Sequence, residues 1–140
     1  MPSTFSQISQ DLAQSIASRK EVLAAYVFGS VASGRERPDS DIDFAVLVDT
    51  SSIPDDLLHY RLRLMAELGQ VLKRSDLEVV ILNEAPPVLA HNAISKGKLI
   101  FERSRSARIS FQIRTFNAFF DTQPMRDYHL QVLKRRYGVR

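Results

Sequence analysis

Glycine, serine and paired aspartates lie within fifteen positions of one another, and their spacing suits phosphate and metal chemistry. Gly29-Ser30 ends one apolar run, and Asp41-Ile42-Asp43 opens the next after a spacer of ten residues. Glycine at a strand end lets the backbone turn sharply and lets a phosphate approach closely. The hydroxyl and main-chain N–H of Ser30, at the start of a short helical turn, favour an anion such as a triphosphate.

The two aspartates are predicted to share one face of a strand. Asp41 and Asp43 are two residues apart, so both side chains leave the same face while Ile42 points into the core. Two carboxylates in a small site resist joint ionisation unless a cation lies between them. Magnesium, which prefers carboxylate oxygens and substrate phosphates, is the expected cation, and two ions are predicted.

A two-metal site usually takes a third carboxylate from a neighbouring strand. Asp76, just before an apolar run at residues 77–82, is the best candidate. Glu78 shares its strand face and is the alternative. The structural alternative for Asp76 is a turn residue that follows Arg74-Ser75.

Each motif also has a simpler interpretation. Gly-Ser at a strand end is usually a turn, and Asp-x-Asp at a strand edge is often solvated surface. Their joint occurrence favours function. Arg35 and Arg37, in the loop between the motifs, are candidate nucleotide-binding residues. Either could contact phosphate, or Arg35 could brace the loop against an aspartate. Three scattered histidines are expected to be surface or structural residues: His59, His91 and His129.

The apolar patterns predict a small α/β or α+β domain. Strands are expected at residues 22–28, 42–48, 77–82 and 99–101. Helices are expected from Ser3 or Thr4, from residues 51–54 to about 73, and at 86–94. We predict a single domain over residues 1–140, with a catalytic core at about 1–103 and a helical extension at 104–140 that breaks near 122–124.

Helical spacing also predicts which side chains are buried. The long helix is expected to bury a stripe of five residues: Leu58, Leu62, Met65, Leu68 and Leu72. In the extension, four apolar residues lie close to one face: Ile109, Ile113, Phe116 and Phe120. The many aromatic residues there are expected to pack the extension onto the sheet, although the excess could dock a partner.

Composition is that of an ordinary globular protein. Apolar residues make up 44% and charged residues 25%, there is no cysteine, and no apolar run is long enough to cross a bilayer. A cytoplasmic location is predicted. The formal charge of +3 is uneven, since residues 1–70 carry −4 and residues 71–140 carry +7. The basic half could meet phosphates, nucleic acid or an acidic partner, but solvated helices are the simpler explanation.

The chain resembles the DNA polymerase β-like nucleotidyltransferase superfamily in its Gly29-Ser30, ten-residue spacer and Asp41-Ile42-Asp43. It is similar to the minimal nucleotidyltransferase (MNT) subgroup over residues 29–46, 76–89 and 96–101. The resemblance implies a small mixed sheet with helices packed on one side and the carboxylates at one end. It also implies that Asp41 and Asp43 bind metal, that Asp76 completes the site, and that Gly29-Ser30 holds the triphosphate.

The resemblance further implies an antitoxin that silences a HEPN-domain ribonuclease toxin by transferring AMP from ATP to a tyrosine hydroxyl. Two alternatives stay open. A small-molecule nucleotidyltransferase, such as an aminoglycoside-modifying enzyme, would need an acceptor pocket, and thirty-nine residues after Phe101 are few for one. An antitoxin that acts by binding alone would not need the three aspartates. A nucleic-acid substrate is disfavoured, because Lys134-Arg135-Arg136 has no interleaved stacking aromatics.

Overall fold

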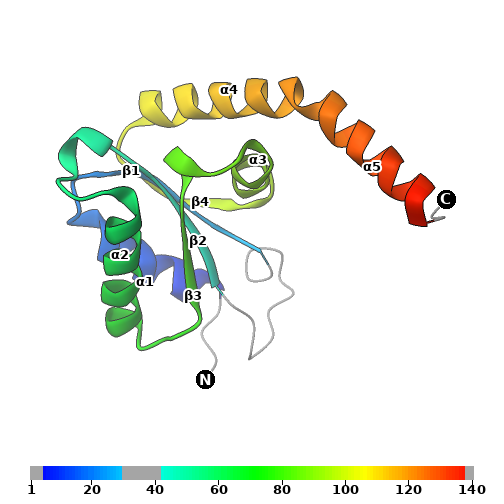
Figure 1. The fold of residues 1–140 in the computed structure, drawn as a ribbon. Helices are drawn as coiled ribbons and strands as arrows, with labels where there is room; N and C mark the ends of the chain where they lie inside the picture. Colours follow the sequence, from blue (N-terminus) through cyan, green and yellow to red (C-terminus); the bar gives the residue numbers. More distant parts are fainter. Residues whose placement is uncertain (1–4, 30–41, 138–140) are drawn as a thin grey trace.

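The fold is a four-stranded mixed sheet with helices on both faces (Figure 1). A computed structural model describes residues 5–29 and 42–137. The strands have the spatial order β3-β2-β1-β4. Their bounds are β1 Val22–Phe28, β2 Ile42–Val48, β3 Leu77–Ile81 and β4 Lys98–Glu102. The helices are α1 Phe5–Ala17, α2 Leu57–Leu72, α3 Pro87–Lys96, α4 Arg105–Asp121 and α5 Gln123–Tyr137, with short 3-10 turns η1 Thr50–Ser52 and η2 Leu82–Glu84.

Strand register brings the end of β1 and the starts of β2 and β3 to one edge of the sheet. β1 runs antiparallel to β2 and to β4, whereas β2 and β3 are parallel. Phe28 is therefore opposite Asp43, and Asp43 is in turn opposite Glu78. The prediction of a mixed sheet is confirmed, with the first two strands at their predicted bounds.

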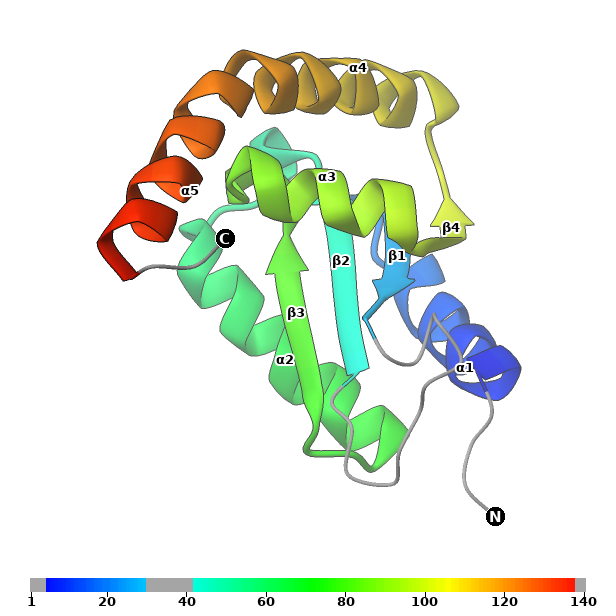
Figure 2. The same cartoon turned by 90° about the vertical axis from the view of Figure 1, so that its right-hand side faces the viewer.

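Each face of the sheet is covered by its own set of helices (Figure 2). One face packs Ile42, Phe44 and Val46 against α1 and α2. The other packs Tyr26 and Ala45 against α3, and α4 lies across α3. The expectation of helices on one side only is wrong. Both faces of the two central strands are apolar, so each needs a cover, and α3 contributes small alanines that allow close packing.

Helix α2 begins later and is rotated relative to the prediction. Its N-cap is Asp56, whose carboxylate accepts the N–H of His59, and the residues around Pro54 precede the helix. The buried side chains are Tyr60, Leu64 and Leu68, while Leu58 and Leu62 are exposed. The predicted stripe is therefore wrong at its first two positions. The buried face instead includes Tyr60, whose hydroxyl donates a hydrogen bond to Glu21 at 2.8 Å.

The C-terminal extension forms two helices that meet at Thr122, as predicted. The buried side of α4 carries Thr115, with Phe111 and Ala118 partly buried beside it. Phe119 stacks on His91 of α3, with ring centroids 3.8 Å apart. Part of the aromatic content thus packs on the domain as expected, but Phe120, which touches the ring of Phe119 edge-on, remains exposed.

The remaining elements are close to their predicted bounds. β3 stops at Ile81 because Leu82 begins a 3-10 turn, in which Asn83 both donates to and accepts from the backbone of Val48. The predicted caps at Ser3 or Thr4, and the helical turn at residues 31–34, lie outside the described residues. None of the described helices has the length and apolarity needed to span a membrane.

Candidate active site

Gly29 and the carboxylate of Asp43 lie in direct proximity at the edge where β1 ends and β2 begins. Gly29 has φ of +81°, a conformation that other residues rarely adopt. A Cβ built on Gly29 would overlap Oδ2 of Asp43 and lie 3.1 Å from its Cγ. Only glycine therefore leaves room for this carboxylate, which is partly buried. The first half of the Gly-Ser motif and the second half of Asp-x-Asp are brought together as the sequence predicts.

Asp76 joins the same edge through its backbone. Its carbonyl oxygen accepts the N–H of Ile42 at 2.8 Å, which ties the start of β3 to the start of β2. Its side chain accepts two hydrogen bonds from Arg74, from Nε to Oδ1 at 2.9 Å and from Nη2 to Oδ2 at 2.7 Å. The Arg74 guanidinium holds the pKa of Asp76 below its usual range, so this carboxylate is ionised at neutral pH.

Glu78 is on the same strand face as Asp43, since the two are register partners in β3 and β2. Its side chain is exposed and pairs with Arg61 of α2, Nη2 to Oε2 at 3.4 Å. Arg61 also donates from Nε to the carbonyl of Val79 at 2.6 Å. Arg61 thus holds Glu78 along the outer edge of β3, whereas Asp76 is held at the start of that strand.

The two arginines that pair with these acids were not predicted from the sequence. Arg74 was treated only as part of a turn, although an arginine two residues before an acid in a tight turn is a recognisable signal. Arg61 is eighteen residues before its acceptor Val79 and carries no local signal. Four predicted site residues lie outside the described part of the chain: Ser30, Arg35, Arg37 and Asp41.

The described donors suit a hard divalent cation. Asp43, Asp76 and Glu78 offer carboxylate oxygens, the ligand type that Mg²⁺ prefers, and Gly29 leaves space beside one of them. Within residues 5–29 and 42–137, no three acid or histidine side chains converge closely enough to hold a metal. A complete ligand set would therefore need Asp41 together with a movement of Asp76 away from Arg74.

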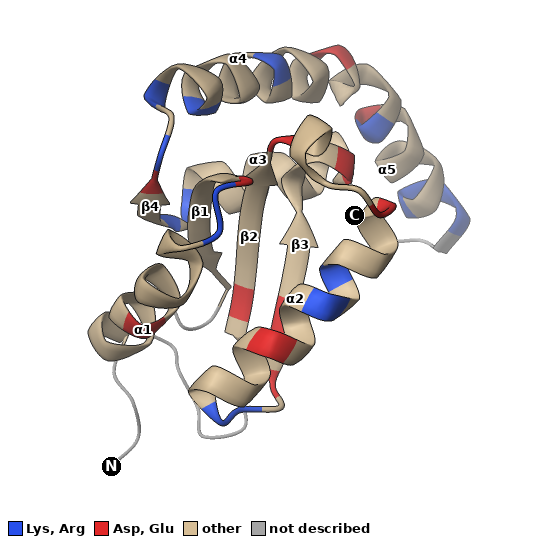
Figure 3. Ribbon diagram, turned by 90° about the vertical axis from the view of Figure 1, so that its left-hand side faces the viewer, with Lys and Arg blue, Asp and Glu red and all other residues tan. Residues whose placement is uncertain are grey.

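Acidic residues are found at the end of the sheet where the candidate metal site lies. Acidic segments lie at neighbouring ends of β2 and β3, and basic ones lie mainly in α2, the α2–β3 turn and the α4–α5 extension (Figure 3). A hollow of about 240 Å³ between η2, α3 and α4 is lined by Asn83, Arg114 and Thr115 among others. Its described lining contains no carboxylate, so we do not assign catalysis to it.

The histidines have structural surroundings, as predicted. His59 is exposed, and its Nδ1 lies 2.8 Å from Oδ2 of Asp56. His91 stacks on Phe119, and His129 is exposed on α5. None of these three described side chains belongs to the Gly29–Asp43 edge.

Comparison with known proteins places the chain in a family. The family model described as polymerase beta, nucleotidyltransferase, matches residues 10–106. A search of curated proteins finds no match.

Several solved structures share the fold. One is a toxin–antitoxin crystallised with AMP-PNP, at a TM-score of 0.74 and 23% identity, covering 89% of this chain and 97% of the other. A second is a tri-AMPylated HEPN toxin from Shewanella oneidensis in complex with an MNT antitoxin, at 0.67 and 23%, covering 89% and 98%. A third is a variant MntA toxin–antitoxin complex, at 0.69 and 25%, covering 91% and 95%.

Proposed function

Because the chain belongs to the polymerase beta nucleotidyltransferase family, we propose that it transfers AMP from ATP to a tyrosine hydroxyl of a cognate HEPN ribonuclease toxin and so silences that toxin. The observation that carries the proposal is the Gly29–Asp43 contact. It joins a glycine-opened turn, suited to a polyphosphate, to a carboxylate suited to a metal.

The reaction balances without a further co-reactant. The acceptor oxygen bonds to the α-phosphorus, the bond between that phosphorus and the bridging oxygen breaks, and pyrophosphate leaves while the hydroxyl proton is released. In this proposal Gly29 and Ser30 hold the triphosphate, and Arg35 and Arg37 supply positive charge to it. The carboxylates of Asp41, Asp43 and Asp76 would hold Mg²⁺, as the two ions predicted from the sequence. Bound Mg²⁺ would neutralise phosphate charge and lower the pKa of the acceptor hydroxyl.

We propose ATP as the nucleotide and a HEPN tyrosine as the acceptor on the basis of the structural neighbours. One structural neighbour holds AMP-PNP, an ATP analogue, and another contains an AMPylated HEPN toxin beside its MNT antitoxin. Both are similar to this chain over nearly its whole length. A tyrosine hydroxyl has an ordinary pKa near ~10, so an acceptor of this kind needs only a moderate shift to attack.

The test is AMP transfer, with ATP and Mg²⁺, to a purified HEPN protein that is the cognate toxin of this chain. We expect intact-protein mass spectrometry to show the addition of AMP on a tyrosine, and we expect Asp43→Asn to abolish it. Glu84→Gln, at an exposed carboxylate in η2 near the opposite end of β2, is the control and should transfer AMP normally. An unmodified HEPN protein in the presence of folded wild-type chain would refute the proposal.

Binding alone is the second candidate function, and the exposed apolar side chains of α4 and α5 favour it. The Asp41→Asn/Asp43→Asn variant separates the two. If this variant still protects cells from the toxin, neutralisation requires binding and not AMP transfer. If protection is lost while the complex still forms, catalysis is required.

A further inference from the structure

A row of four apolar side chains runs along α4; three of them are exposed, and the fourth, Phe116, lies against His91 of α3 with ring centroids 5.2 Å apart. Ile109, Ile113 and Phe120 are exposed, and Phe116, partly buried, completes their spacing of four, three and four residues. We call these four residues the outer stripe. The buried side of the same helix is made by Thr115 and its neighbours, so the three exposed members of the outer stripe do not belong to the core of the domain.

The spacing of the outer stripe indicates what kind of element would cover it. Apolar residues that alternate at intervals of three and four form the seam along which two helices pack in a coiled coil. In an ordinary surface helix the apolar residues face the core and the opposite face is polar. Helix α4 is apolar on both sides, which is typical of a helix that lies between a domain and a partner helix.

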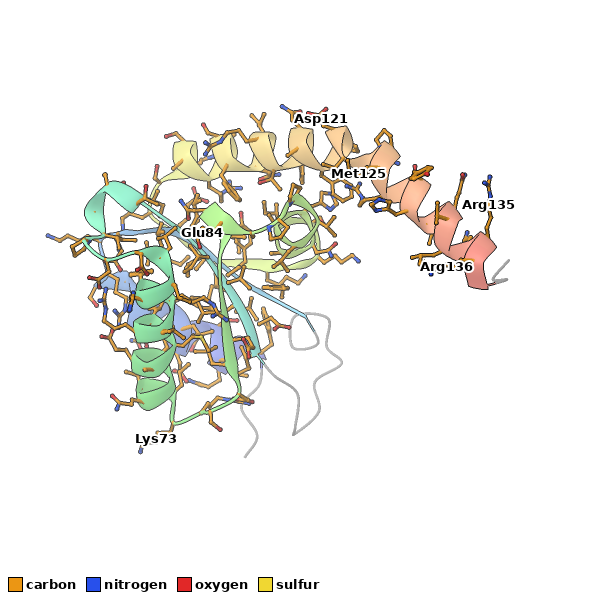
Figure 4. The ribbon with its side chains drawn as sticks, viewed as in Figure 1. Lys73, Glu84, Asp121, Met125, Arg135 and Arg136 are labelled. Atoms are coloured by element: carbon orange, nitrogen blue, oxygen red, sulfur yellow. The ribbon has the colours of Figure 1, made fainter. Side chains whose placement is uncertain are left out.

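Helix α5 extends this surface beyond the domain (Figure 4). Every described side chain from residue 127 to residue 136 is exposed, including Tyr128, Leu130 and Leu133. An isolated helix of about fifteen residues is marginal in water. Arg126 anchors only its start, through a stack on Phe119 at 3.9 Å and a hydrogen bond to the Phe119 carbonyl. The rest of α5 gains packing only if another molecule covers it.

The positive charge of this extension indicates that its partner is acidic. Residues 105–137 contain seven Lys or Arg and two Asp, a net charge of +5. Basic side chains continue to the far end of α5, where Arg135 and Arg136 lie far from the sheet (Figure 4). A second copy of this chain would bring +5 against +5, which disfavours self-association across this face.

We propose that the outer stripe, continued by α5, is the docking surface for an acidic amphipathic helix of the toxin partner. The apolar side of that helix would cover Ile113 and Phe120, and its acidic flanks would face the surrounding arginines. This inference rests on the proposed function for the identity of the partner. It adds a second contact, remote from the Gly29–Asp43 edge, that would hold the toxin while its tyrosine is modified.

The experiment compares two double variants in the inactive Asp41→Asn/Asp43→Asn background, so that modification does not alter affinity. Ile113→Asp/Phe120→Asp places acids on the outer stripe. Leu58→Asp/Leu62→Asp is the matched control on α2, where the exposed fractions are 58% and 51% against 55% and 60%. Circular dichroism checks that both fold. Isothermal titration with the purified HEPN protein measures Kd.

We expect the stripe variant to bind about a hundredfold more weakly or worse, and the control to bind within about threefold of its parent. We also expect the parent's affinity to fall as salt rises, because opposite charges meet at the interface. In the active background, the stripe variant should need more toxin to reach half-maximal AMP transfer, with the rate at saturation preserved.

Several outcomes would overturn this inference. If the stripe variant binds the HEPN protein as tightly as its parent while wild type transfers AMP, the docking surface is wrong and the proposed function stands. If wild type neither binds nor modifies the HEPN protein, both are wrong. If sedimentation shows a dimer of this chain that the stripe variant dissociates, the occupant is a second copy. Affinity independent of salt would refute an acidic partner.

Discussion

Arg74 occupies both carboxylate oxygens of Asp76, with Nε donating to Oδ1 at 2.9 Å and Nη2 donating to Oδ2 at 2.7 Å. Asp76 is the third carboxylate of the proposed site, and its side chain is only one-quarter exposed. A cation that binds Asp76 must therefore displace Arg74 or share the carboxylate with it. The ion pair keeps Asp76 ionised and fixed at the start of β3 before nucleotide arrives.

Replacing Arg74 with glutamine should tighten metal binding. The substitution removes a competing cation from Asp76, and a hydrogen bond to a charged group contributes about 1.5–3 kcal/mol before partial exposure reduces it. We expect Mn²⁺, used as a probe for Mg²⁺, to bind Arg74→Gln about three- to tenfold more tightly, as measured by electron paramagnetic resonance of free Mn²⁺.

Lys73→Gln is the matched control for this prediction. It removes the same charge from the adjacent exposed residue, whose side chain does not pair with Asp76, and should change Mn²⁺ affinity by less than about twofold because exposed charges are well screened. Equal or weaker Mn²⁺ binding by Arg74→Gln would mean that Arg74 orients the carboxylate more than it competes for it.

Replacing Gly29 with alanine should have a large effect on AMP transfer and only a moderate effect on the stability of the fold. The added Cβ would overlap Oδ2 of Asp43, and a φ of +81° costs an L-residue about 1–2 kcal/mol. We expect the melting temperature to fall by several degrees and AMP transfer to fall about 10²-fold or more, since small displacements of reacting groups have large effects.

Asn83→Ala is the control that distinguishes a general loss of stability from a local change at the Gly29–Asp43 edge. It removes two hydrogen bonds to Val48, at the opposite end of β2, and should lower the melting temperature by a similar amount. Its AMP transfer, measured well below the melting temperature, should remain close to that of wild type. If both variants lose activity equally, loss of stability explains the effect and Gly29 has no special role beside Asp43.

The sheet and its site edge were predictable because the signals are local. The two central strands are short, mainly apolar runs bounded by glycine or charged residues, so their composition and length identify them. The proximity of Gly29 and Asp43 then follows from one antiparallel pairing. Asp76 reaches the same edge because β3 runs parallel to β2, which a helix-length crossover between them favours.

Helix rotation and ion pairing were not predictable from the same patterns. On α2, Leu58 and Leu62 fit an apolar stripe as well as Leu64 does, but the face that turns inward is the one where Leu64 packs in the core and Tyr60 bonds Glu21. On α4, two apolar stripes compete, and packing on α3 selects the one that contains Phe111 and Thr115. Such choices depend on residues far apart in the sequence.

Asp76 and Glu78 differ enough in their surroundings to predict which one completes the site. Asp76 is anchored by its own carbonyl to Ile42, whereas exposed Glu78 is drawn along the strand edge by Arg61. We expect Asp76→Asn to reduce AMP transfer about 10²-fold or more, and Glu78→Gln to reduce it less than about threefold. Steady-state assays of both variants, with Mn²⁺ affinity measured in parallel, provide the comparison. The reverse order of effects would assign the third carboxylate to Glu78.

The N-cap of α2 predicts an acid dependence of stability with a definite sign. The backbone N–H of His59, and then its side chain, lower the pKa of Asp56 below its ordinary value. The folded carboxylate therefore binds a proton less tightly than the unfolded one. Its contribution is present above the unfolded pKa of about ~3.9 and is lost as pH falls through the lower folded pKa.

Asp56→Asn keeps a good helix cap but removes the titrating group. Below about pH 4, the melting temperature of wild type should therefore fall more steeply than that of Asp56→Asn, as followed by circular dichroism at 222 nm. Asp56→Ala loses the cap itself, so its melting temperature should lie below both at neutral pH and approach wild type in acid. Parallel acid profiles for wild type and Asp56→Asn would show that the cap is equally strong when the carboxyl is protonated.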